Sequence, residues 1–283
     1  MQEISYRFIN ANDLSLHVAE AGPRDGSPVI LLHGFPDASF GWEKQMKALA
    51  EAGFYVIAPD QRGYNLSDKP NGLENYRVGL LVADVLALAD VLGLTQFNLA
   101  GHDWGALVSW NLVENHPERL KRLAILNVPH PRIMNKFLKE NYRQRLKSWY
   151  AFFFQLPIVP EIVLGAFNWG LLARQMRRSF SEAELNRYRA AWSQPGAMTA
   201  MLNWYRCLFR LSPQAIGKKK IQLPTLMIWG KLDPHLMWQM APGSIDLCEN
   251  GRLEYLEDAT HWVQQDKPDQ VNQLLIDHFT TAR

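Results

Sequence analysis

The sequence predicts an α/β fold in which a mostly parallel central sheet is flanked by helices and carries an inserted helical cap. Short segments rich in Val, Ile and Leu alternate with longer segments of helical period, a pattern typical of strand–helix units. About 95 residues without a comparable strand signal separate LAILNV from TLMIWG, so we expect an insertion between them. A chain of 283 residues, 47% of them hydrophobic, is long enough to bury the core of such a fold.

Seven short apolar segments are expected to form the strands. In chain order they are LSLHVAE, PVILLHG, FYVIAPD, FNLAGHD, LAILNV, TLMIWG and RLEYLE. Residues 131–217 are expected to form the cap, because SEAELNRYRAAW and AMTAMLNWYRCLF have helical spacing and prolines break the segments between them. Residues 1–130 and 218–283 then form the α/β core. Open α/β sheets bind ligands at the carboxyl edge of their strands, so we expect the cap to cover that edge.

Composition argues against several classes of partner. The 30 basic and 28 acidic residues nearly balance, and the longest basic run is Lys218 to Lys220, so nothing indicates a nucleic acid or an anionic membrane as partner. The most apolar stretch, residues 151–167, is interrupted by prolines and polar residues and is not expected to span a membrane. Cys207 and Cys248 form no C-x-x-C pair and the first residues lack signal-peptide features, so a cytoplasmic location is expected.

The stretch LAGHDWG predicts a nucleophile elbow with Asp103 at its centre. FNLAGHD is an expected strand, GALVSWNLVENHP has helical period, and Gly101 and Gly105 flank the carboxylate. A strand-to-helix turn this tight needs small neighbours and lifts its central side chain beside a helix N-terminus. The alternative is an ordinary turn in which Asp103 caps the helix.

Two further residues follow Asp103 in the order that elbow enzymes use, which is nucleophile, acid, histidine. Asp233 lies in IWGKLDPHL and His261 in LEDATHW, each just after an expected strand. The alternatives are a simple Asp-Pro turn for Asp233 and a surface-loop histidine for His261. The loop after LAILNV offers only Asn127, which is not a carboxylate.

The segment HGFP, His33 to Pro36, comes directly after an expected strand. In elbow enzymes this loop supplies one backbone N–H to an oxyanion hole, and the residue after the nucleophile supplies the other. The donors here would be the amides of Phe35 and Trp104. The Phe35–Pro36 bond is a candidate cis peptide. We find no metal-ligand spacing such as H-E-x-x-H or C-x-x-C, and we expect no metal and no cofactor.

Over nearly its whole length the chain resembles the soluble, bacterial-type epoxide hydrolases of the α/β-hydrolase fold. The resemblance rests on HGFP, GHDWGA, PDQRGYNLSD, GKLDPH and THW. One departure is Asn65, where relatives often carry glycine. The resemblance implies that Tyr150 and Tyr205 of the cap donate hydrogen bonds to the epoxide oxygen; otherwise they are buried packing residues. The apolar residues Pro36, Phe152, Phe153, Phe154, Trp169 and Met198 are expected to line the substrate pocket, which favours a hydrophobic substrate.

The resemblance implies hydrolysis of a hydrophobic epoxide to a vicinal diol, and the residue types explain how such a reaction would proceed. An aspartate, with an ordinary pKa of about 3.9, is ionised at neutral pH and can attack an oxirane carbon without a base. His261, oriented by Asp233, is then free to activate the water that hydrolyses the ester. Haloalkane and fluoroacetate dehalogenases share the aspartate elbow, and a non-catalytic ligand-binding protein of the same fold is a remoter alternative. The sequence leaves the particular epoxide open, and equally whether the protein is a monomer or a homodimer.

Overall fold

The computed structural model describes residues 3–211 and 220–281, and in these ranges it shows a single eight-stranded sheet with helices on both faces. The strand order is β1-β2-β4-β3-β5-β6-β7-β8. The strands are β1 Ser5–Ala11, β2 Leu14–Ala21, β3 Pro28–Leu32, β4 Tyr55–Pro59, β5 Phe97–His102, β6 Leu120–Leu126, β7 Thr225–Gly230 and β8 Gly251–Leu256. β1 pairs with β2, and β2 with β4, in antiparallel fashion, whereas every other pair is parallel. The predicted α/β class is confirmed.

Two apolar layers hold the sheet between its helices. Along β3, Val29 and Leu31 belong to one buried cluster, while Ile30 and Leu32 belong to the other, as the alternation of side chains along a strand requires. The helices of the core are α1 Glu43–Glu51, α2 Val78–Val91, α3 Trp104–Asn115, α10 Met240–Ile245, α11 Val263–Asp266 and α12 Pro268–Thr280. Residues of α1, α11 and α12 cover the first face and those of α2 and α3 the second. Short 3-10 helices occupy Ser39–Trp42, Leu73–Tyr76 and Pro117–Arg119.

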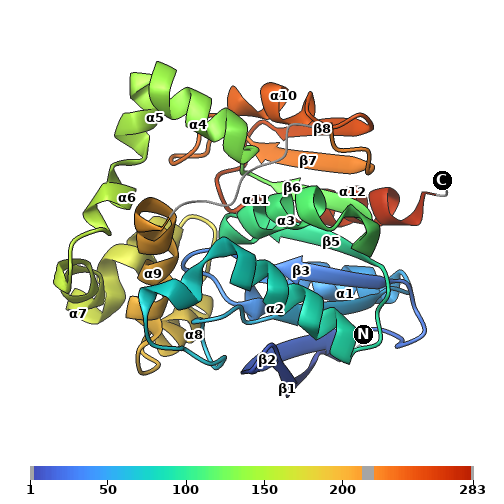
Figure 1. Ribbon diagram of the computed structural model, residues 1–283, viewed down its shortest axis with the longest axis horizontal. Coiled ribbons are helices and arrows are strands. Elements are labelled where there is room, and N and C mark those ends of the chain that lie inside the picture. The colour runs from blue at the N-terminus through green and yellow to red at the C-terminus, as the bar shows by residue number, and fades with distance from the viewer. Residues whose placement is uncertain (1–2, 212–219, 282–283) are drawn as a thin grey trace.

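The expected insertion is a block of helices between β6 and β7. It contains α4 Pro131–Glu140, α5 Tyr142–Lys147, α6 Trp149–Phe153, α7 Val159–Met176, α8 Glu182–Trp192 and α9 Ala197–Arg210. In Figure 1 most of this block lies to one side of the sheet. The expected end of the cap at residue 217, and Lys218 and Lys219 of the basic run, lie outside the described residues.

All seven expected strands are present, and the structure adds β1, which was not predicted. This strand lies at the edge of the sheet, and five of its seven side chains are exposed. An edge strand buries few side chains, so SYRFINA lacks the apolar run by which the other strands were recognised.

Candidate active site

Asp103 lies in the turn between β5 and α3, with a backbone conformation of φ 51° and ψ −121°. A non-glycine residue seldom adopts a positive φ, and the surrounding contacts must enforce it. One such contact is at Gly105, where an added Cβ would lie 2.1 Å from the carbonyl oxygen of Leu32. The helix can therefore start this close to the neighbouring strand only with glycine at position 105, and the tight turn directs Asp103 out of the sheet.

The Asp103 carboxylate has two differently placed oxygens. Oδ1 accepts a hydrogen bond of 2.7 Å from the backbone N–H of Phe35, and Oδ2 lies 3.4 Å from Nε2 of His261. Burial alone would raise the pKa of Asp103, but the hydrogen bond and charge of His261 and the Phe35 amide hold it below its usual value. The carboxylate is therefore ionised at neutral pH.

The loop after β3 approaches this carboxylate closely. A Cβ added to Gly34 would lie 2.2 Å from the Cβ of Asp103, so only glycine lets the Phe35 amide reach Oδ1. The Phe35–Pro36 peptide is cis, as the sequence suggested. Trp104, the other predicted amide donor, is the first residue of α3.

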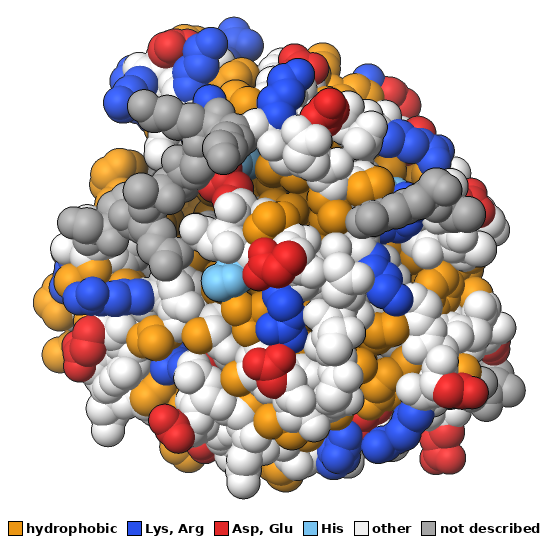
Figure 2. All heavy atoms as spheres, turned by 45° about the vertical axis from the view of Figure 1, so that its right-hand side comes forward, with side chains coloured by type: hydrophobic (Ala, Val, Ile, Leu, Met, Phe, Trp, Pro, Cys, Tyr) orange, Lys and Arg blue, Asp and Glu red, His pale blue; other side chains and the backbone are white. Residues whose placement is uncertain are grey.

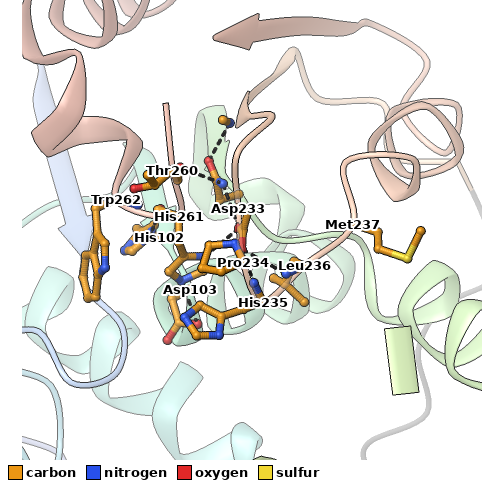
Figure 3. A network of polar contacts seen from close by, with 12 residues as sticks. His102, Asp103, Asp233, Pro234, His235, Leu236, Met237, Thr260, His261 and Trp262 are labelled. Carbon is orange, nitrogen blue, oxygen red and sulfur yellow. Dashed lines mark hydrogen bonds and ion pairs between the residues drawn. The ribbon is translucent and has the colours of Figure 1, made fainter. Parts of the chain in front are cut away.

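His261 lies between two carboxylates, because its second ring nitrogen, Nδ1, faces Asp233. Nδ1 of His261 lies 2.7 Å from Oδ2 of Asp233, and Oδ1 of Asp233 accepts bonds of 2.7 and 2.9 Å from the amides of His235 and Leu236. Figure 3 shows these groups gathered around His261. Burial opposes the charge of Asp233, yet His261 lowers the pKa of this carboxyl to about 2. Burial likewise opposes the charge of His261, but Asp233 and Asp103 raise its pKa to about 10.

Three polar residues around this group were not assigned to it from the sequence. Asn127, which follows β6, donates a 2.9 Å hydrogen bond from Nδ2 to Oδ2 of Asp233. Nε2 of His102 donates to the main-chain oxygen of His261 at 2.8 Å, and burial lowers the pKa of His102 to about 3, so this ring is neutral. The third is His235, whose ring centre lies 5.4 Å from that of His261. Their positions in the sequence were the available signals. His102 directly precedes Asp103, His235 lies two residues after Asp233, and Asn127 follows the end of a strand.

The two cap tyrosines converge on the same place from different helices. Tyr150 on α6 and Tyr205 on α9 have ring centres 6.1 Å apart. The ring of Tyr205 lies 4.8 Å from that of Trp104 and 5.4 Å from that of Phe35, while Tyr150 lies 5.6 Å from His235. Burial, followed by the negative charge of Asp103, raises the pKa of both phenols well above the ordinary value, so both keep their protons.

The aromatic residues expected to line the pocket are not all placed alike. Phe154 is buried, with its ring 5.5 Å from Phe35 and 5.0 Å from Tyr205. Phe153 is half-buried against Phe154. Phe152 is 59% exposed and packs on Phe209, because the single turn of α6 that directs Tyr150 inward directs Phe152 outward.

The remaining predicted pocket residues lie in different places, Pro36 at a contact between core and cap and Trp169 between two cap helices. The carbonyl oxygen of Pro36 accepts a 2.6 Å bond from Nε1 of Trp192 on α8. Trp169 packs its ring 6.1 Å from that of Trp192 and donates to the Ser193 hydroxyl at 2.7 Å, whereas Met198 is buried in the apolar cluster. Within residues 3–211 and 220–281, no group of three His, Cys, Asp or Glu side chains is placed to hold a metal ion.

This fold and this elbow define a class of protein, and comparison with known families agrees. The family model described as "alpha/beta hydrolase fold" matches residues 27–268. The AB hydrolase superfamily protein YfhM of Bacillus subtilis is 42% identical, with 99% of each chain covered. Epoxide hydrolase A of Mycobacterium tuberculosis is 32% identical, with 97% of each chain covered.

Solved structures of epoxide hydrolases are similar to this chain over nearly its whole length. An epoxide hydrolase from Bacillus megaterium has a TM-score of 0.90 and 30% identity, covering 97% of this chain and 100% of that one. A variant of that enzyme has been solved with its product, a naphthyloxy propane diol. The chain therefore belongs to the α/β-hydrolase fold family, in the branch that contains the epoxide hydrolases.

Proposed function

We propose that the protein hydrolyses a hydrophobic epoxide to a vicinal diol through an ester formed on Asp103. One observation carries the proposal: an ionised carboxylate with one oxygen on a backbone amide and the other facing a histidine, beside two protonated tyrosines. A carboxylate nucleophile needs no base for its attack, whereas a serine would. A pair of phenols suits a reaction that creates an alkoxide in a water-poor site.

In the first step Oδ2 of Asp103 attacks an oxirane carbon, and the bond from that carbon to the ring oxygen breaks. Tyr150 or Tyr205 gives its proton to the resulting alkoxide and becomes a phenolate. The ester no longer carries the negative charge that helped to raise the pKa of His261, so His261 can pass its proton to the phenolate. The phenol is restored and His261 becomes a neutral base.

In the second step His261 takes a proton from water as the water oxygen attacks the carbonyl carbon of the ester. The negative charge develops on Oδ1, where the Phe35 amide already donates and the Trp104 amide is the second proposed donor. When the bond from the carbonyl carbon to Oδ2 breaks, His261 protonates the leaving oxygen and the diol departs. The proton of the new carboxyl group then returns to His261, and the resting state is restored.

The apolar surroundings indicate an aryl or alkyl epoxide. Phe154 and Phe35 lie against Tyr205. The product bound in the Bacillus megaterium structure is a diol that carries an aryl ether. A dehalogenase would use the same Asp103, so a panel of terminal and internal epoxides should be assayed beside halide release from haloalkanes.

The covalent route is tested by one turnover in oxygen-18 water. We expect the first diol to carry an unlabelled oxygen from Asp103 and the label to enter the carboxylate, as seen by mass spectrometry of the peptide. Asp103→Asn should stay folded and lose turnover. Label in the first-turnover diol would overturn the ester intermediate.

A further inference from the structure

The cap exposes an unusual concentration of large hydrophobic side chains. Of the sixteen that the described residues expose, ten lie between residues 142 and 171, on α5, α6, α7 and the loop before α7. Six of them define what we term the apolar cap face, namely Leu146, Trp149, Phe152, Ile158, Ile162 and Phe167. Phe167 is 92% exposed. Scattered exposed hydrophobic residues are ordinary, but this many within 30 residues mark a site of interaction.

Helical spacing places these side chains in pairs on two neighbouring helices. Tyr142 and Leu146 lie four residues apart on α5, and Trp149 and Phe152 lie three residues apart on α6, so each pair shares one side of its own helix. Tyr150, next to Trp149, points the other way, toward Tyr205 and His235. The short helix α6 therefore has one side at the candidate active site and the other on the apolar cap face.

Basic side chains stand next to these hydrophobic ones. Lys136, Lys139, Arg143 and Arg145 on α4 and α5 are exposed, and none forms an ion pair with a carboxylate of the described residues. Glu140 is the single acidic residue between positions 136 and 147. Several blue side chains, with a red one among them, lie at the upper left of Figure 2, the side on which Figure 1 draws α4 and α5. The net charge of +2 for the whole chain conceals this local excess.

We propose that the apolar cap face and its four cations dock on the surface of an anionic lipid bilayer. Exposed Trp, Phe, Leu and Ile beside Lys and Arg are the composition of segments that lie in a membrane interface, with cations at the headgroups and apolar side chains below them. No helix in the described part of the chain is long and apolar enough to cross a bilayer, so the contact is peripheral. Because Tyr150 shares α6 with this face, docking places the candidate site beside the phase in which a hydrophobic epoxide concentrates; this last step rests on the proposed function.

Vesicle binding tests the docking surface without reference to catalysis. We expect the wild-type protein and Asp103→Asn to sediment equally with phosphatidylcholine vesicles containing phosphatidylglycerol at low ionic strength. Binding should be much weaker to phosphatidylcholine alone and should fall as salt is added. Absence of binding to the anionic vesicles at low salt would overturn the proposal.

Matched variants separate this face from general charge and hydrophobicity. The combined change Lys136→Gln, Lys139→Gln, Arg143→Gln and Arg145→Gln should weaken partitioning about a hundredfold or more, because each cation near an anionic surface contributes appreciably. The control changes Lys44, Lys47, Lys121 and Arg252, all exposed on the core, to Gln and should bind almost as the wild type does. An equal loss of vesicle binding in the cap variant and in the core control would show that only the net charge matters, and would overturn the proposal.

A second pair of variants tests the apolar part. Leu146→Gln with Ile162→Gln, at side chains 67% and 66% exposed, should lower vesicle binding at least tenfold, roughly as expected for lost apolar burial. Phe8→Gln with Val91→Gln, both 58% exposed on the core, is the control and should bind as the wild type does. If the first pair leaves vesicle binding intact and instead abolishes a dimer detected by analytical ultracentrifugation, the face binds a second copy of this chain and the lipid proposal is wrong.

Turnover then connects docking with supply of substrate. In the Leu146→Gln, Ile162→Gln variant, hydrolysis of a water-soluble epoxide should be unchanged, whereas hydrolysis of a long-chain alkyl epoxide held in anionic vesicles should fall in proportion to binding. Equal rates on the vesicle-held epoxide would contradict supply from the bilayer. Failure of the wild-type protein on every epoxide would count against the proposed function and leave the vesicle result standing.

Discussion

At the scale of single residues, the protonation of His261 connects the two proposed half-reactions. With Asp103 and Asp233 both ionised, the resting histidine has a pKa of about 10 and carries a proton at neutral pH. A protonated imidazole cannot activate water, so hydrolysis has to wait until an ester forms on Asp103. The geometry thereby favours the order of events that the covalent route requires.

Replacing His261 should separate these half-reactions. His261→Gln keeps a polar side chain of similar length but offers no base, so we expect it to consume about one equivalent of epoxide per site and to accumulate the ester. Intact-protein mass spectrometry measures the adduct. Asp233→Asn should show a milder form of this behaviour, because an amide can orient the ring but cannot stabilise its positive charge. A folded, substrate-binding His261→Gln protein without adduct would contradict the role proposed for the histidine.

The sequence could indicate Asp103, Asp233 and His261 because each follows a strand and the three occur in a known order. It could not indicate His102 as a neighbour of His261, because the hydrogen bond between them joins positions 159 residues apart. Asn127 was excluded as the acid on its side-chain type, but its contact with Asp233 depends on the adjacency of β6 and β7. Motifs thus predicted the candidate reacting groups, while the positions of the groups around them required the topology.

At the scale of elements, the proposed site depends on cap helices meeting loops of the core. The aromatic rings of Tyr150 and Tyr205 come from α6 and α9, about 55 residues apart in the sequence, and meet next to Trp104. Helical periodicity predicted that such helices exist. It could not predict which side chains would face inward, so Phe152 was expected inside and lies outside.

The tyrosine pair should matter for ring opening and much less for ester hydrolysis. Each change of Tyr150 or Tyr205 to Phe removes one donor to the developing alkoxide, a loss of about 2 to 4 kcal/mol by analogy with oxyanion-hole variants. The double variant should therefore almost stop alkylation of Asp103. Pre-steady-state measurement of alkylation in the two single variants and the double variant checks this expectation. Alkylation at the wild-type rate in the double variant would leave the tyrosines as packing residues and reopen the dehalogenase alternative.

Helix α8 holds the loop that carries the Phe35 amide. Trp192 donates to the carbonyl oxygen of Pro36, and the Tyr188 hydroxyl donates to Oδ1 of buried Asp37 at 2.7 Å. Trp192→Phe should leave the Pro36 carbonyl unpaired in a buried place and lower the free energy of unfolding by about 1 to 3 kcal/mol.

Urea denaturation measures this loss. Trp169→Phe is the control, because the bond it removes ends on a hydroxyl nearer the surface, and it should cost clearly less. An equal or smaller loss for Trp192→Phe would show that the bond to Pro36 contributes little to holding cap and core together.

At the scale of the whole molecule, average properties of the sequence predicted the class of fold but not the distribution of its surface. The alternation of strand and helix signals and the long interval before TLMIWG were enough to predict the sheet and its insertion, since both depend on local periodicity. The near-balance of charge gave no indication of a nucleic acid or an anionic membrane as partner. Only the packing of the cap shows that hydrophobic and basic side chains of residues 136–171 remain exposed.

Burial of histidines throughout the molecule should determine how stability depends on pH. Burial is the main cause that lowers the pKa of His102 to about 3, and the pKa of His235 and of His278 to about 4; the pKa of His33 is lowered as well. Below pH 6.5 these histidines become protonated in the unfolded chain but stay neutral in the folded protein until the pH is much lower. Each such proton removes about 1.4 kcal/mol of stability per pH unit.

Other groups act against this trend or limit it on the alkaline side. Burial raises the pKa of Asp37 to about 7 and also raises that of Asp84, so these two carboxyls gain protons in the folded state as pH falls, and this partly offsets the histidines. The raised pKa of His261 contributes stability that is complete below pH 6.5 and is lost as pH rises toward about 10. Stability should therefore be greatest near pH 6.5.

Urea midpoints at pH 5, 6.5 and 8 measure this maximum. Two variants then test which histidine causes the loss of stability on the acidic side and which on the alkaline side. His278→Gln retains a donor for the carbonyl oxygen of Leu123, which the native ring contacts at 2.9 Å, but does not titrate, so the loss between pH 6.5 and 5 should become smaller. His261→Gln should flatten the decline between pH 6.5 and 8, because the group whose pKa is raised in the folded state is gone. A midpoint that rises between pH 6.5 and 5 would mean that the buried carboxyls, which gain protons on folding in that range, outweigh the buried histidines, which lose them.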